Sequence, residues 1–353
     1  MRHALLAAAT LALTLPASAQ EAPEGAPSPN QIVDAASAEE WVVIPPEDLL
    51  VMTLAPDAEG NEREVVIQLM PAPFSQGWVS NIKTLARAKW YDGITVNRVQ
   101  DNYVVQWGDP GHDNPESGET ETKPLPEGLK VMGEDEYFTW VSDQQIPWMW
   151  SVTGRIASRS AGTPPGFQIN PTAVPRFSDP YTSAVSYSGS FPVGLWFGGD
   201  GPASFGSLPA KAWPVHCYGM VGVGRSYSPD TGSGAELYTV IGHAPRHLDR
   251  NIALVGRIVH GMEHLSSLPR GSGALGFYTE EEADKRTPIL SIRVAADLSE
   301  EEQPQFEYLS TESESFVAYT EARANRRDPF FIVPAGGADI CNIPVPIREV
   351  VPE

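Results

Sequence analysis

The chain has 353 residues, and its 24 lysines and arginines against 45 aspartates and glutamates give a formal net charge of −21. This balance argues against non-specific binding to nucleic acids or anionic membranes, because both depend on clustered basic side chains. The 33 prolines and 31 glycines favour a loop-rich β protein over a helical bundle, in a chain long enough to bury a substantial core.

The first residues have the features of a secretory signal. A basic pair, Arg2 and His3, precedes an apolar stretch, Ala4–Leu15, that is too short to span a bilayer comfortably. Small residues at 17–19 fit the cleavage rule, so the sequence predicts a signal peptide over residues 1–19 and a periplasmic, exported product. Residues 20–40, rich in proline, alanine and acid, are expected to form a flexible lead-in. No later run reaches transmembrane length, so no membrane insertion is expected.

The body of the chain alternates short apolar runs with turns, and one helix-type pattern comes early. Apolar residues at helical spacing predict a helix after Ser75 that ends near Gly93. A short helix is expected around Met262 and Leu265. The predicted strands occupy residues 48–54, 64–69, 94–98, 104–108, 218–223, 236–241, 252–259 and 288–294.

The hairpin within Tyr91–Pro110 carries an arginine at the end of its first apolar run. By period-two alternation, Ile94, Val96 and Arg98 are expected on one face of the first strand, and Val104 and Gln106 on one face of the second. Together with Tyr103, this arrangement predicts a groove lined by an arginine, an amide and an aromatic ring beside apolar surface.

This hairpin resembles the arginine-bearing segment of the cyclophilins, the barrel-shaped peptidyl-prolyl cis-trans isomerases. Four other segments resemble cyclophilin segments in the family's order: 79–93, 219–224, 231–240 and 248–256. The resemblance covers about 48–110 and 215–295. It implies a mainly β fold, a closed antiparallel eight-stranded barrel capped by two helices, over residues 41–300, with a large loop-rich insertion at about 111–215.

The resemblance also implies a site. Arg98 and Gln106 take the catalytic positions, and no cofactor is needed. The substrate-binding positions fall on Tyr103, Val104, Gly222, Glu236, Tyr238, His247 and Leu248. The chain departs from the family at Val104, Glu236 and Ile252, where members usually have methionine, glutamine and often histidine. A carboxylate at Glu236 is expected to disfavour acidic residues near the substrate proline.

The chemistry implied is rotation of an X–Pro bond, whose barrier is about 18–20 kcal/mol. A guanidinium aimed at the prolyl nitrogen would bind the twisted amide better than either planar form. We therefore expect a monomeric prolyl isomerase that acts on proline-containing exported polypeptides and assists their folding. The alternative is a cyclophilin-like binding module or holdase with little catalysis.

Three other features have more than one interpretation. Cys217 and Cys341 could form one disulfide in an oxidising compartment or remain two buried thiols. His260-Gly261-Met262-Glu263-His264 matches an inverted zinc motif, but no further ligand cluster follows, so solvent-facing histidines and no metal are expected. Asp230-Thr231-Gly232-Ser233 matches an aspartic-protease signature but lacks its preceding apolar strand.

The insertion at about 111–215 and a C-terminal extension make this chain longer than the cyclophilins that it resembles. The insertion carries Trp140, Trp148, Trp150 and Trp196, which could serve ordinary packing or add a wall to the groove. The extension, residues 301–353, predicts a helix over 315–327 and short extended pieces at 330–333 and 343–347. Both extras are expected to pack on the barrel.

Overall fold

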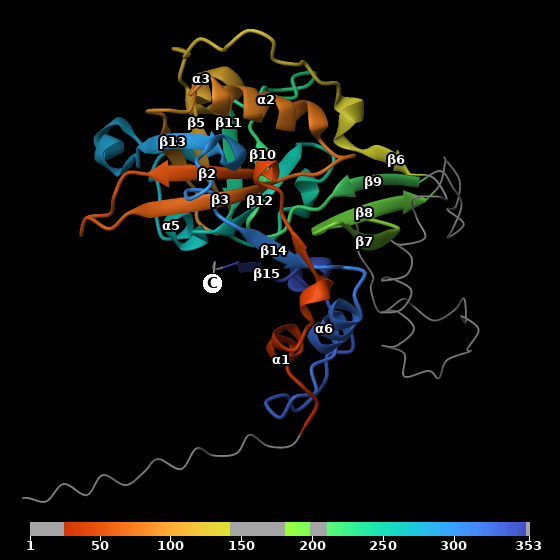
Figure 1. Cartoon of the computed structure of the whole chain (residues 1–353). Helices are drawn as coiled ribbons and strands as arrows, with labels where there is room; N and C mark the ends of the chain where they lie inside the picture. Colours follow the sequence, from red (N-terminus) through yellow and green to blue (C-terminus); the bar gives the residue numbers. More distant parts are fainter. Residues whose placement is uncertain (1–24, 142–180, 198–209, 351–353) are drawn as a thin grey trace, which may run out of the picture.

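The computed structural model describes residues 25–141, 181–197 and 210–350 (Figure 1). The predicted signal peptide and its cleavage point lie outside these residues. Within the described ranges, no helix combines the length and the apolar character that crossing a bilayer requires.

An eight-stranded antiparallel sheet forms the centre of the molecule. Its strands follow the order β13-β2-β3-β12-β10-β11-β5-β4, and the two outermost strands meet. The Val96 amide donates to the Thr287 carbonyl over 2.9 Å, and the Ile289 amide to the Ile94 carbonyl over 2.8 Å. The sheet is thus a nearly closed barrel, and the predicted mainly β fold is confirmed. The strands are β2 (Leu49–Leu54), β3 (Arg63–Leu69), β4 (Thr95–Val99), β5 (Val104–Gly108), β10 (Met220–Val223), β11 (Glu236–Val240), β12 (Leu254–His260) and β13 (Ile289–Val294).

Two helices of the predicted kind accompany the barrel, α2 (Gln76–Arg87) and α5 (Met262–Ser266), which lie above and below it in Figure 1. In α2 the buried side chains recur at helical spacing, because Trp78, Ile82 and Leu85 all point into the core. In α5 the fully buried residue is Leu265.

A bulge in β4 changes the expected arrangement of faces. The register pairs Val96 with Trp107 and then Arg98 with Gln106, so that Asn97 is an extra residue on its strand. Val96 and Trp107 therefore belong to the core, while Arg98 and Gln106 lie on the opposite face. The expectation that Val96 and Arg98 share a face is wrong for this reason.

The insertion after β5 contains a second sheet, ordered β6-β9-β8-β7. Its strands are β6 (Thr139–Val141), β7 (Ala184–Ser188), β8 (Phe191–Phe197) and β9 (Ala210–Pro214), preceded by α3 (Pro110–Asp113). The Lys130 carbonyl accepts from Asn81 of α2 over 2.9 Å, and Ser190 donates to Gln68 of β3 over 3.1 Å. The described insertion thus packs on α2 and on the β3 side of the barrel. Trp140 and Trp196 are exposed, whereas Trp148 and Trp150 lie outside the described residues.

Both ends of the chain join a third sheet, ordered β1-β14-β15 (Figure 1). Its strands are β1 (Trp41–Val43), β14 (Phe306–Leu309) and β15 (Ile347–Glu349), and helices α1 (Pro29–Asp34) and α6 (Glu314–Ala324) lie beside each other next to it. Within the expected flexible lead-in, residues 29–34 instead form α1, in which Ile32 and Val33 pack against the core. Residues 330–333 form an exposed loop instead of the expected extended piece.

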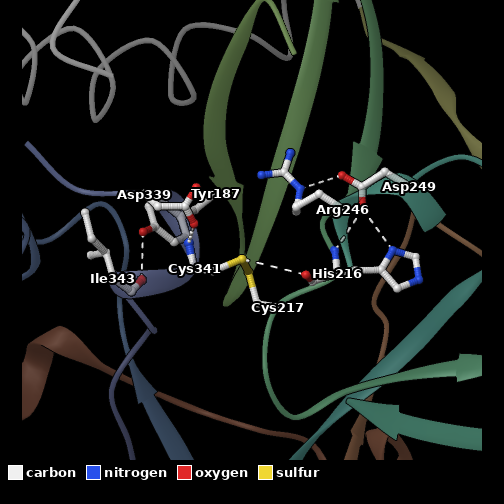
Figure 2. The surroundings of a disulfide bond; sticks show 8 residues. All are labelled: Tyr187, His216, Cys217, Arg246, Asp249, Asp339, Cys341 and Ile343. Carbon is white, nitrogen blue, oxygen red and sulfur yellow. Dashed lines mark hydrogen bonds and ion pairs between the residues drawn. A yellow bond between two sulfur atoms is a disulfide. The ribbon is translucent and has the colours of Figure 1, made fainter. Parts of the chain in front are cut away.

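The two cysteines form a disulfide between the barrel side and the extension. Cys217, which follows β9, is bonded to Cys341, and their Cα atoms are 5.1 Å apart (Figure 2). The alternative of two free thiols is therefore wrong. One hydrophobic cluster also runs through the barrel, the insertion and the extension, and includes Ile67, Val193 and Phe316.

Candidate functional site

Four predicted site residues lie in a row across four neighbouring strands. The register pairs Arg98 with Gln106, Gln106 with Tyr238, and Tyr238 with Gly222, on β4, β5, β11 and β10 respectively. Residues directly opposite each other on neighbouring strands point to the same face. The sheet thus brings together residues that are far apart in sequence, such as Arg98 and Tyr238, and places them on the face opposite the core.

The Arg98 guanidinium is fixed by three hydrogen bonds and two aromatic rings. It donates to the Gln106 Oε1 atom over 3.0 Å from Nη1, to the Leu275 carbonyl over 2.7 Å from Nε, and to the Gln100 side chain from Nη2. Its Cζ atom lies 5.6 Å from the ring centre of Tyr103 and 5.3 Å from that of Phe277. The residue is only 9% exposed, and burial lowers the pKa of Arg98 from its ordinary value. A cation held in this way keeps one orientation, which is a requirement for acting on a developing charge.

Leu275 and Phe277, which contact Arg98, belong to a segment that the sequence analysis did not include in the site. Residues 271–278 run along β4, where the Gly271 amide donates to the Val99 carbonyl over 3.0 Å and the Tyr278 amide to the Asn97 carbonyl over 3.1 Å. Gly276 has a φ of +83°, and a Cβ there would lie 2.7 Å from the Gln100 Cα atom. Gly276 is therefore the feature of the sequence that could have indicated that this segment packs closely against Gln100.

A small apolar cluster lies next to the arginine on the same face. Its buried members are Val104, Tyr238 and Val240, with Tyr103 and Ile252 packed against them. Gly222 makes room for it, because a Cβ there would lie 2.3 Å from the Cζ atom of Tyr238. An apolar cluster beside a few fixed polar groups suits a proline ring next to an amide.

Three predicted substrate contacts are placed differently. Glu236 is fully buried, and its Oε1 atom accepts from the Asn97 amide group over 3.3 Å, so its carboxylate does not reach the rim. His247 and Leu248 lie on the short 3-10 helix η5 (Arg246–Leu248), where His247 is exposed and Leu248 half-buried. Ile252, which follows this turn, packs against the apolar cluster in the manner expected of Leu248.

The zinc-like motif is divided between two elements. His260 is the last residue of β12, Gly261 has a φ of +75°, and His264 lies on α5, so the two histidines are not one turn apart on one helix. Among the described residues, no group of three or more His, Cys, Asp or Glu side chains could hold a metal ion.

The protease-like motif is a turn. The Asp230 carboxylate accepts from the backbone amides of Ser226, over 2.7 Å, and Gly232, over 3.1 Å, and so stabilises its own loop.

Comparison with known proteins gives a family for this architecture. The family model described as "Cyclophilin type peptidyl-prolyl cis-trans isomerase/CLD" matches residues 59–294, more than half of the chain. A crystal structure of a cyclophilin from Hirschia baltica matches with a TM-score of 0.55 and 17% identity, over 90% of this chain and 99% of that chain. That likeness supports the fold.

Two crystal structures of a cyclophilin-type peptidyl-prolyl cis-trans isomerase from Cryptosporidium parvum also match. The first has a TM-score of 0.35 and 10% identity, over 70% of this chain and 96% of that chain. The second, described as being in the presence of the dipeptide Ala-Pro, has a TM-score of 0.34 and 10% identity, over 69% and 97%. No curated protein matches the sequence.

Proposed function

The chain belongs to the cyclophilin-type peptidyl-prolyl cis-trans isomerases, and from that premise we propose that it acts on X–Pro bonds of exported polypeptides and assists their folding. The observation that carries this proposal is the row of Arg98, Gln106, Tyr238 and Gly222 beside the apolar cluster. The row offers a fixed cation next to a surface suited to a proline ring.

Arg98 has the central role in this proposal. Twisting the X–Pro amide removes its resonance and leaves a lone pair on the prolyl nitrogen, which a fixed guanidinium can stabilise. Three N–H groups of Arg98 are used by Leu275, Gln106 and Gln100, and a guanidinium has five. Two donors are therefore left for the substrate. Because the cation is already oriented, little reorganisation is needed as the amide twists.

Gln106 supports the arginine in this arrangement. Its Oε1 atom accepts from Arg98, so its amide NH₂ group is left to donate to a substrate carbonyl. Tyr103, Val104, Tyr238 and Ile252 would surround the proline ring and hold it while the preceding carbonyl rotates.

A test of isomerisation is a protease-coupled or NMR-exchange assay on X–Pro peptides with purified protein starting at Gln20. We expect the exchange rate to rise in proportion to protein concentration. Binding of the same peptides without any faster exchange would favour the alternative of a proline-segment binding module.

Export is a separate part of the proposal and rests on the basic start, the short apolar stretch and the small residues at 17–19. The intact mass of the protein from a periplasmic fraction is expected to match a chain that starts at Gln20. A mass that retains Met1, or recovery from the cytoplasm alone, would contradict it.

A further inference from the structure

The hydroxyl of Tyr238 is bound to a buried chain of polar side chains behind the apolar cluster. It lies 2.8 Å from Nε2 of His216, whose Nδ1 lies 2.8 Å from the Asp249 carboxylate. The other oxygen of Asp249 accepts from Nε of Arg246 over 2.7 Å (Figure 2). All four residues are at most 5% exposed, and His216 is fully buried.

The surroundings of His216 determine where its proton lies. The Asp249 Oδ1 atom accepts from the backbone amide of His216 over 3.0 Å as well as facing Nδ1, so Nδ1 carries the hydrogen. Burial lowers the pKa of His216, against the opposing effect of Asp249, and so favours the neutral ring. Nε2 is then an acceptor, and the Tyr238 hydroxyl donates to it.

Tyr238 is held from two directions as a result. Its ring lies against the backbone of Gly222, where no side chain would fit, and its plane is within 8° of the His216 ring plane. Val104 and Ile252 pack with it in the apolar cluster. Because the hydroxyl is buried, loss of its acceptor would leave a polar group unpaired, and the ring would have to move to reach water.

The loop that carries His216 is itself tied to the C-terminal extension. Cys217, the next residue, is bonded to Cys341, and the Cys341 sulfur lies 3.7 Å from the His216 carbonyl oxygen (Figure 2). The Cys341 amide donates to the Asp339 carboxylate over 2.8 Å, and the Ile343 carbonyl accepts from Tyr187 of β7 over 2.8 Å. The extension and the insertion therefore both support the position of His216.

We propose that His216 is a positioning residue for substrate binding, which holds the Tyr238 wall of the proline pocket in place through the hydroxyl hydrogen bond. This inference rests on the proposed function for the identity of the ligand. It does not make His216 a catalytic residue, since His216 is fully buried and meets the site row through the Tyr238 hydroxyl.

The test combines His216→Leu, Tyr238→Phe and the double variant, with His264→Leu on α5 as the matched control. KM and kcat are measured on one X–Pro peptide, and the Tyr238 ring signals are followed by NMR of tyrosine-labelled protein without substrate. Because a pocket wall grips planar and twisted prolines alike, we expect His216→Leu to raise KM about tenfold and to change kcat by less than about twofold. The Tyr238 signals should shift with it, and His264→Leu should change neither readout.

The decisive comparison is the double variant. Without the hydroxyl, there is no buried polar group for His216 to satisfy, so Tyr238→Phe and the double variant are expected to have KM values within about twofold of each other. A KM in the double variant about tenfold above that of Tyr238→Phe would show that His216 acts independently of the hydroxyl, and would overturn the proposal.

Two further measurements keep the test informative. If His216→Leu does not fold, His216→Gln takes its place, since its amide oxygen can accept from the Tyr238 hydroxyl. An unchanged KM then supports the proposal, and a rise of about tenfold overturns it. If the wild type shows no isomerase activity, the proposed function fails, and the shift of the Tyr238 ring signals alone decides whether His216 positions this residue.

Discussion

Replacing Arg98 by alanine tests the catalytic and structural roles of the guanidinium together. Loss of the fixed guanidinium beside the apolar cluster is expected to lower kcat/KM by about 10²- to 10³-fold, the scale of losing one strong transition-state donor. The structure adds a cost in stability, because the Gln106 amide oxygen, in a residue only 4% exposed, loses its donor. An unpaired buried acceptor costs about 1–3 kcal/mol, so the free energy of unfolding should fall by about that amount.

The assay separates the two effects. Activity is measured well below the unfolding transition, and stability is measured by urea denaturation, with Arg87→Ala on α2 as the control. Arg87 is an exposed arginine paired with Glu47 and Asp297, so its loss should cost at most about 1 kcal/mol and leave kcat/KM unchanged. Arg98→Lys should lose nearly as much activity as Arg98→Ala, since an ammonium cannot make the three fixed contacts of the fork. Activity of Arg98→Ala within about threefold of the wild type would refute this account of the site.

The remaining predictions concern a buried acid, the disulfide and pH. Glu236→Gln should keep the contact with Asn97, because an amide oxygen can accept in place of the carboxylate. Since the carboxylate is buried, the variant should leave the ratio of rates on Lys-Pro and Glu-Pro peptides at low salt unchanged within about twofold. A tenfold change in this ratio would contradict the prediction. Cys341→Ser should lower the free energy of unfolding by about 5 kcal/mol, since the bond to Cys217 closes a loop over a separation of 124 residues, and equal denaturation midpoints would refute it. The folded pKa of His216 lies below its usual 6.5, so an unfolded chain takes up a proton that the folded one does not, and stability should fall as the pH drops below about 6.5. The fall in Tm between pH 7 and pH 5 should be smaller in His216→Gln, and identical falls would exclude His216 as a cause.

The regular part of the fold was predictable because local patterns determine it. The alternation of apolar residues marked the barrel strands, and Trp78, Ile82 and Leu85 marked α2. The faces in the arginine hairpin were not predictable in the same way. A bulge at Asn97 shifts the register by one residue, and strict alternation cannot show where such an extra residue is accommodated.

The candidate site was predictable where it follows strand register and not where it depends on loops. Arg98, Gln106, Tyr238 and Gly222 come together because their strands pair. Glu236 is fully buried and accepts a hydrogen bond from Asn97, the extra residue of the β4 bulge, and composition and spacing do not indicate this.

The contacts from Leu275 and His216 depend on loops far away in the sequence. No periodic pattern encodes a tertiary contact of that kind, so only the structure could show that Arg98 is buried rather than lying open on an outer groove.

The sheet built from both ends of the chain has a consequence for how this protein can be divided. The family-matched stretch stops at residue 294, where β13 ends, and it contains every residue of the site row. A fragment cut there would nevertheless lose Phe306, which packs with Val51 and Val66 of the barrel, as well as the sulfur partner of Cys217. The stretch that matches the family therefore ends before the segments that pack on the barrel do. Transplanting the site into a relative, or trimming it to a minimal enzyme, would require carrying the segments of the third sheet, β1, β14 and β15, along with it.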